Sequence, residues 1–111
     1  MGGTVIQGDV CWYTFKEPDK RRPVLILTRN SAIPVLSSLT VAPITTVIRG
    51  IPTEVRLGQA EGLLTDCAVN LDNIQTVQKA KMGALITHLS SHHMRTVRKA
   101  IEFKLGFDAL H

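Results

Sequence analysis

The chain has 111 residues, 44% of them apolar and 20% charged. These values are typical of one globular domain and exclude a disordered, collagen-like or low-complexity chain. The net charge of +4 is compatible with an anionic partner but does not require one. The longest uncharged stretch, residues 30–48, contains two prolines and several hydroxyl residues, so we expect no membrane-spanning helix.

The N-terminus shows no signal-peptide pattern, and Cys11 and Cys67 have neither a CxxC nor a metal-site spacing. We therefore expect two reduced thiols in a cytoplasmic protein.

Short strands with intervening turn signals dominate the first two thirds of the sequence. The continuous apolar run at residues 23–28 predicts a strand buried on both faces, and Pro43 predicts an edge position or a bulge in its strand. The charged residues 16–22 predict a loop with a turn at Pro18-Asp19, and residues 30–38 predict a second loop. The predicted strands are residues 8–15, 23–28, 39–45, 53–57, 66–71 and 75–78.

The last third changes to a helical period. Four apolar residues recur at spacings of three, four and four and predict one buried helix stripe. Ser90 or Ser91 is expected to cap the start, and Gly106 stands where a left-handed C-cap belongs. Five or six strands and one helix favour a small, strongly bent antiparallel barrel. The stripe consists of Met94, Val97, Ile101 and Leu105.

Basic side chains gather in two places. Residues 79–111 carry the whole net charge, and the simplest interpretation of Arg95, Arg98 and Lys99 is a solvated helix face. Residues 16–29 carry five basic side chains, and an anion site there is a second interpretation.

The sequence gives little support to metal or nucleophilic catalysis. His88 and His92 have a zinc-like spacing, but the predicted helix begins between them and no third ligand accompanies them. No GxSxG motif and no glycine-rich phosphate loop occurs, and the aromatic content of 5% is too low for a base-stacking platform. Three features remain, and each also has a purely structural explanation. They are Arg22-Pro23, the Pro43–Thr46 segment and Asp72.

Five short motifs, spread over nearly the whole chain, together resemble a known protein family. They are GDV at 8–10, RRPVLILT at 21–28, VAPITT at 41–46, EGLLTDCAV at 61–69 and LDNIQTVQK at 71–79. The combination resembles the MazF/PemK family of toxin endoribonucleases. The resemblance implies one SH3-like antiparallel barrel with a C-terminal helix across residues 1–111, and a homodimer. It also implies sequence-specific, metal-independent cleavage of single-stranded RNA, and neutralisation by an antitoxin with an acidic disordered tail.

The resemblance also assigns site residues. Arg22 matches the family's arginine before proline and would bind the phosphate, and Thr45 matches the threonine of its PIT motif; these two would be catalytic. Thr46, Lys20, Arg21, Asp72 and Gln75 would contact the substrate.

The chain departs from the family pattern in two places. Asn70 and Gln75 stand where some members have arginines, which leaves Arg22 with less help. Asp72 is either a base or a turn residue that holds its loop. The first loop, residues 16–22, is short, and the cleavage motif does not follow from the sequence.

Two other functions fit the same fold class. A CcdB-like toxin binds and poisons a protein target without catalysis, but it would not need Arg22 with Thr45. A peptide-binding SH3-like or OB-like adaptor ranks last, because one Trp and one Tyr make a poor aromatic groove.

Overall fold

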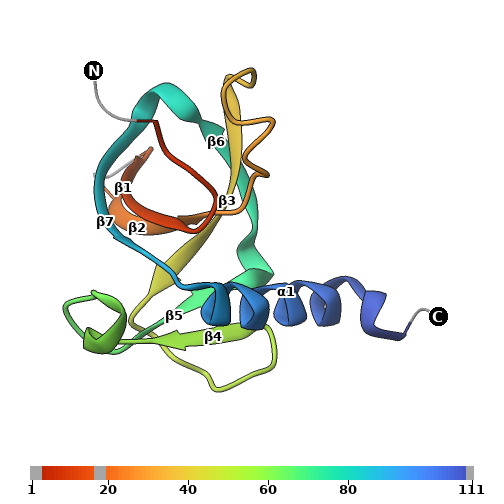
Figure 1. Cartoon of the computed structure of the whole chain (residues 1–111). Coiled ribbons are helices and arrows are strands. Elements are labelled where there is room, and N and C mark those ends of the chain that lie inside the picture. The colour runs from red at the N-terminus through yellow and green to blue at the C-terminus, as the bar shows by residue number, and fades with distance from the viewer. Residues whose placement is uncertain (1–3, 17–19, 110–111) are drawn as a thin grey trace.

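The computed structural model describes residues 4–16 and 20–109 of the chain. Within that part, seven strands precede one α-helix, and four short 3₁₀ turns lie between or after them (Figure 1). The strands are β1 (Asp9–Phe15), β2 (Lys20–Ile26), β3 (Ser38–Thr45), β4 (Glu54–Leu57), β5 (Cys67–Asn70), β6 (Gln75–Gln78) and β7 (Met82–His88). The helix is α1 (Ser91–Leu105), and the turns are η1 (Gln59–Glu61), η2 (Leu71–Asn73), η3 (Lys79–Lys81) and η4 (Phe107–Ala109).

All strands pair antiparallel in the order β4-β5-β3-β2-β1-β7. The sixth strand, β6, pairs with the first half of β3, while β5 pairs with its end. Since one edge of β3 serves two strands in succession, the sheet bends sharply along β3 (Figure 1). The predicted mainly-β fold, a strongly bent antiparallel sheet with a C-terminal helix, is confirmed. Within the described residues the sheet is not closed, however, because its two end strands, β4 and β7, do not pair with each other.

Strand β2 separates two hydrophobic clusters, as its continuous apolar run predicted. Val24 and Ile26 face one cluster with Tyr13 and Val41, whereas Leu25 faces the other. The side chains of Val24, Leu25 and Ile26 are fully buried, and burial of each contributes roughly 1.5–3 kcal/mol. This rigid strand carries Arg21 and Arg22 at its start, so these two arginines lie on a strand rather than in the predicted loop. The predicted turn at Pro18-Asp19 lies outside the described residues.

The pairing of strand β3 explains how a proline can stand inside it. Pro43 pairs with Val24 of β2 on one side. On the other side, pairing with β6 ends at Val41 and pairing with β5 begins at Ile44. A proline, which has no N–H, fits this gap in the ladder, so Pro43 lies at a local break in an internal strand.

The sequence did not predict strand β7. It pairs with β1 from Asp9↔His88 to Tyr13↔Met82 through two irregularities in register. Gly83 and Ala84 have low strand propensity, and most of β7 is exposed, so neither composition nor alternation marks it as a strand.

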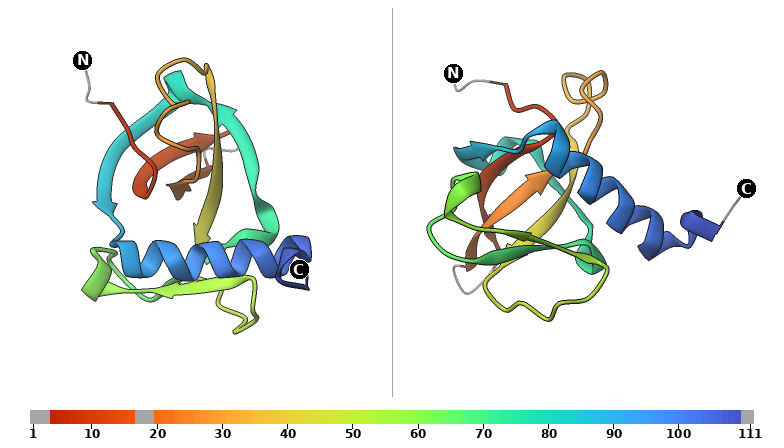
Figure 2. Two further views of the ribbon diagram at one scale, coloured as in Figure 1. Left: turned by 45° about the vertical axis from the view of Figure 1, so that its right-hand side comes forward. Right: turned by 60° about the horizontal axis from the view of Figure 1, so that its bottom comes forward.

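Helix α1 begins and ends where its capping residues predicted. The Ser90 Oγ accepts a hydrogen bond from the His93 N–H, and Gly106 adopts a left-handed φ of 77°. Val97 is buried, and Met94 and Ile101 pack against the same cluster as β4 and β5. Leu105 is 53% exposed, so the predicted stripe ends one turn early. Figure 2 shows this end of the helix projecting beyond the strands.

Candidate active site

Strand pairing brings Arg22 and Thr45 together. The pairing of β2 with β3 ends at Val24 and Pro43, and Arg22 and Thr45 stand two residues beyond this pair on their strands. Because side chains alternate across a strand, Arg22, Val24 and Thr45 share one face. Arg22 is exposed and Thr45 is half-buried. The two residues predicted to be catalytic are therefore neighbours at the end of a rigid pair of strands.

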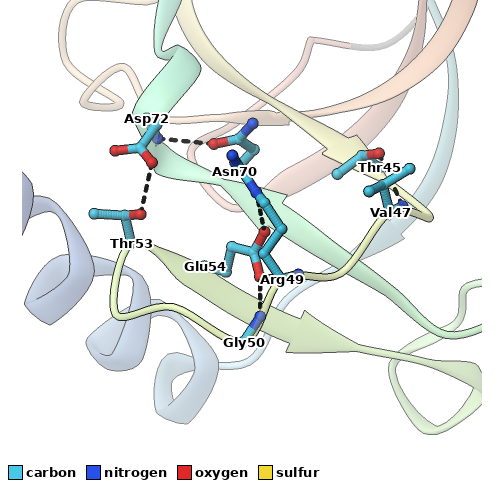
Figure 3. Close-up of polar contacts among 8 residues, drawn as sticks. All are labelled: Thr45, Val47, Arg49, Gly50, Thr53, Glu54, Asn70 and Asp72. Carbon is cyan, nitrogen blue, oxygen red and sulfur yellow. Dashed lines mark hydrogen bonds and ion pairs between the residues drawn. The ribbon is translucent and has the colours of Figure 1, made fainter.

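The Thr45 hydroxyl is held in place by the chain that follows it. The Val47 N–H donates a hydrogen bond of 3.1 Å to Thr45 Oγ1 (Figure 3). This bond uses the hydroxyl oxygen as an acceptor, and the hydroxyl hydrogen can still be donated to a ligand. A backbone turn thus orients one hydrogen-bond donor beside Arg22.

Arg22 and Thr45 lie on the wall of an open groove of about 550 Å³. Its described lining carries two guanidinium groups, those of Arg22 and Arg49, and no carboxylate or imidazole. The other lining residues are Phe15, Pro43, Ile44, Val47, Asn70, Asn73 and Gln75. Such a surface, with cations, amides and one aromatic ring, suits a phosphate-bearing ligand better than a cationic one.

Arg49 enters the groove from the loop between β3 and β4. Its Nε lies 3.4 Å from Glu54 Oε2, and the backbone N–H groups of Arg49 and Gly50 both donate to Glu54 Oε1 at 2.9 Å. Figure 3 shows the arginine side chain running past Glu54 toward Asn70. The sequence alone does not mark Arg49 as a site residue, since its loop carries no motif. The only local signal was a cation next to glycine, shortly after the strand that carries Thr45.

Asp72 lies apart from the groove lining. The Thr53 hydroxyl donates to its Oδ2 at 2.8 Å, and Lys104 Nζ lies 3.3 Å from its Oδ1. The Asp72 N–H donates to Asn70 Oδ1 in the same turn. The Thr53 hydrogen bond, followed by Lys104 and opposed by partial burial, lowers the pKa of Asp72. These contacts tie η2 to the residue that precedes β4 and to the end of α1, which favours the turn role for Asp72.

A second hollow of about 300 Å³ borders the groove and shares Arg22, Ile44 and Thr45 with it. Arg21 and Thr46 line it. The Arg21 guanidinium lies 4.3 Å from the centre of the Trp12 ring, a cation–π contact that holds it against the strand. Of the other predicted contact residues, Gln75 lines the groove itself, and the side chain of Lys20 lies outside the described residues.

The two cysteines and His88 do not line the groove. Both cysteines are buried and unpaired. Burial, reinforced by Asp9, raises the pKa of Cys11 to about 11, and burial with nearby Asp66 raises the pKa of Cys67. Both thiols therefore stay protonated at neutral pH and are poor nucleophiles. His88 contacts Asp9 at 2.9 Å, outside the groove.

Two further features are missing from the described residues. No group of three or more His, Cys, Asp or Glu side chains there is arranged to hold a metal ion. No helix in this part of the chain has the length and apolar character needed to cross a membrane.

The fold and the groove together define a class of protein: a small, strand-rich domain with a cationic groove where two strands end. A family model identifies this class more closely. Residues 6–105 match the model described as "PemK-like, MazF-like toxin of type II toxin-antitoxin system". The chain belongs to this family.

Relatives and solved structures agree with this family. The chain is 43% identical over 83 residues to endoribonuclease MazF3 of Mycobacterium tuberculosis, covering 75% of this chain and 81% of the relative. It is 38% identical to the probable endoribonuclease MazF5 of the same organism, over 86% and 88% of the two chains. Among solved structures, the M. tuberculosis toxin MazF-mt6 is 37% identical with a TM-score of 0.81, over 88% of this chain and 96% of that one. An endoribonuclease in complex with its cognate antitoxin, from a mycobacterial species, has a TM-score of 0.81 at 26% identity, over 92% and 95% of the two chains.

Proposed function

We propose that this chain is an endoribonuclease toxin that cleaves single-stranded RNA in the groove beside Arg22 and Thr45. The observation that supports this proposal is that Arg22 and Thr45 line one open groove, where the Thr45 hydroxyl is oriented by the Val47 N–H. Family membership and relatives named as endoribonucleases support the same activity. A pure binding toxin of the CcdB type is not favoured, because it has no use for this pair.

The groove suits a cleavage in which the RNA supplies its own nucleophile. The ribose 2′-oxygen attacks the adjacent phosphorus, and the bond from phosphorus to the 5′-oxygen breaks. The 2′-hydroxyl loses its proton to a base, and the leaving 5′-oxygen takes up a proton. The products are a 2′,3′-cyclic phosphate and a 5′-hydroxyl end, so no metal-activated water is needed.

Arg22 and Thr45 each have a defined task in this reaction. The planar guanidinium of Arg22 can donate two parallel hydrogen bonds to nonbridging phosphate oxygens. Negative charge on these oxygens grows as the 2′-oxygen attacks, so donors already in place stabilise the transition state more than the substrate. The hydroxyl of Thr45 supplies a further donor from the adjacent strand.

The remaining predicted contact residues extend this site along the RNA. Gln75 can hydrogen-bond a base or ribose within the groove. Arg21 and Thr46, on the wall of the second hollow, and Lys20 would contact neighbouring nucleotides. Asp72 would act on the substrate only indirectly, by holding η2 and with it Asn73 in the groove wall.

The partners follow from the family and the substrate. A cognate antitoxin with an acidic disordered segment would neutralise the toxin by occupying the cationic groove, and a relative of similar fold is described in complex with its antitoxin. We also propose a homodimer in the cytoplasm, with messenger RNA as the first candidate for the single-stranded substrate and ribosomal or transfer RNA as the alternatives.

The test uses a long end-labelled single-stranded RNA and purified protein in excess EDTA. We expect discrete cuts with 2′,3′-cyclic phosphate ends, and we expect Arg22→Ala to abolish them while leaving the melting temperature unchanged, because an exposed arginine contributes little to stability. Arg56→Ala is the matched control, since Arg56 is another exposed strand arginine. Cleavage by Arg22→Ala at the wild-type rate would refute the site, and no cleavage by folded wild-type protein would refute the activity.

A further inference from the structure

We propose that Arg49 is a second catalytic arginine, which stabilises the charge on the phosphate in the transition state, and that Glu54 positions it. This inference rests on the proposed RNA cleavage and adds a residue that no motif in the sequence identifies. The juxtaposition that carries it is the presence of Arg49 and Arg22 on the lining of one groove, together with Thr45 at the end of β3.

The loop that presents Arg49 is held by a single carboxylate. Oε1 of Glu54 accepts the backbone N–H groups of Arg49 and Gly50, both at 2.9 Å, while Oε2 faces the Arg49 Nε at 3.4 Å. One side chain at the start of β4 thus fixes both the backbone and the guanidinium of the residue. Such a two-point anchor orients an arginine far more strictly than a solvent-exposed ion pair does.

The exposure of the two partners differs sharply. The Glu54 side chain is 1% exposed, whereas the Arg49 side chain is 52% exposed. Burial alone disfavours the charged carboxylate, but the hydrogen bonds from the two backbone N–H groups and the Arg49 guanidinium outweigh it and lower the pKa of Glu54. Glu54 is therefore ionised at neutral pH, and its oxygens are occupied by the loop, so it is an anchor rather than a general base.

The guanidinium keeps donors for a ligand after binding Glu54. An arginine has five N–H groups, and Glu54 faces only the one at Nε. Figure 3 shows the end of the Arg49 side chain toward Asn70, and both residues line the groove together with Arg22 and Gln75. A phosphate held by Arg22 and Thr45 would therefore meet a second cation from the opposite loop.

A second cation beside the phosphate would stabilise the transition state of the cleavage. As the 2′-oxygen attacks, the phosphate gains negative charge, and one guanidinium supplies only one compensating positive charge. Arg49 is the other cation in the described lining of the groove. Its charge is worth more in the transition state than in the substrate, so it should act on kcat more than on KM.

The experiment compares four variants on an RNA that carries the mapped cleavage site. We expect Arg49→Ala to lower kcat at saturating RNA by about 10²-fold, as removal of one preorganised donor does. Arg49→Lys should fall between wild type and Arg49→Ala, because it keeps the charge and loses the planar fork. Glu54→Gln should also lower kcat, by less than Arg49→Ala. Its amide oxygen can still accept the two backbone N–H groups, but its NH₂ group replaces the acceptor that faces Arg49 Nε.

Arg98→Ala is the matched control. Arg98 also has an exposed guanidinium whose Nε lies 3.2 Å from a glutamate oxygen, but that partner is Glu102 on the helix surface. This variant loses the same charge and the same kind of ion pair, and it should cleave like wild type. Melting temperatures of all variants exclude a folding defect.

Three results would overturn the inference. In the first, Arg49→Ala cleaves at the wild-type rate. In the second, Arg49→Ala raises KM and leaves kcat unchanged, which is the signature of substrate binding alone. In the third, Arg98→Ala loses as much kcat as Arg49→Ala, which would mean that the effect comes from net charge. Each of these leaves wild-type cleavage and the Arg22 requirement intact. Failure of the proposed function itself would instead appear as absence of cleavage by the wild-type chain.

Discussion

At the residue scale, the hydroxyl of Thr45 allows a test that separates catalysis from turn formation. Its oxygen accepts the Val47 N–H, so a purely structural threonine would matter for the turn and not for the rate. If its hydrogen is donated to the phosphate, Thr45→Ala should lower the single-turnover cleavage rate by about 10²-fold. Thr45→Ser, which keeps the hydroxyl, should retain most of the rate. Equal rates for wild type and Thr45→Ala would leave Thr45 as a turn residue.

Asp72 allows the opposite test, because its contacts predict a role in stability. The Thr53 hydroxyl and Lys104 lower its pKa below the ordinary value of 3.8. A carboxyl with a lowered folded-state pKa stabilises the protein when ionised, above its ordinary pKa, and this stabilisation is lost as the pH falls through the folded-state value. Asp72→Asn should therefore unfold at a lower urea concentration than wild type at pH 7, and the difference should shrink on acidification below about pH 4.

The control for this comparison is Asp108→Asn, which changes an exposed carboxylate on η4. It should leave the urea midpoint nearly unchanged across the same pH range. Asp72→Asn should also retain the cleavage rate. A large loss of rate in Asp72→Asn protein of undiminished stability would make Asp72 a substrate-contacting residue after all.

These residues also show how far a sequence can predict a site. Arg22 and Thr45 stand in motifs at the ends of two neighbouring strands, and both line one groove. Arg49 has no such signal, because its position depends on Glu54 at the start of the next strand and on the bend that turns this loop toward the groove. Contacts of that kind are set by tertiary structure, so they are invisible to periodicity and composition.

At the scale of single elements, the start of α1 decides between two candidate caps. The structure assigns the cap to Ser90, whose hydroxyl accepts the His93 N–H at 3.3 Å, and makes Ser91 the first helical residue. Ser90→Ala should lower the free energy of unfolding by about 1 kcal/mol, the usual cost of losing an N-cap. Ser91→Ala should change it by no more than about 0.5 kcal/mol, as exposed substitutions usually do. Denaturant titration of both variants measures the difference, and a larger effect at Ser91 would contradict the assignment.

The elements differ in how well the sequence predicts them, and the reason is local chemistry. Strand β2 has an uninterrupted apolar run because both of its faces are buried, and α1 has two capping residues and an apolar stripe. Strand β7 has neither feature, because it is an edge strand, exposed along most of its length. Its pairing partner β1 lies at the opposite end of the sequence, so only the folded chain reveals it.

At the scale of the whole molecule, the charge is spread over two separate surfaces. Residues 79–111 carry the entire net charge of +4, yet the groove cations Arg22 and Arg49 lie outside this segment. Arg95 and Arg98 line a different hollow, beside Gln7 and Leu27. Net charge therefore does not locate the site, and the basic helix and the groove can be tested independently as RNA-binding surfaces.

The salt dependence of RNA affinity distinguishes these two surfaces. Each phosphate that a protein cation neutralises adds about 0.7 to the slope of log affinity against log salt for a single strand. If the groove alone binds RNA, Arg22→Ala and Arg49→Ala should each reduce the slope by about 0.7, whereas the double variant Arg95→Ala, Arg98→Ala should leave it unchanged. Fluorescence anisotropy with a 2′-O-methyl RNA, which lacks the nucleophile and is not cleaved, measures the slope directly. A reduced slope in the helix variant would mean that the RNA extends from the groove across α1, and would assign that basic face to binding.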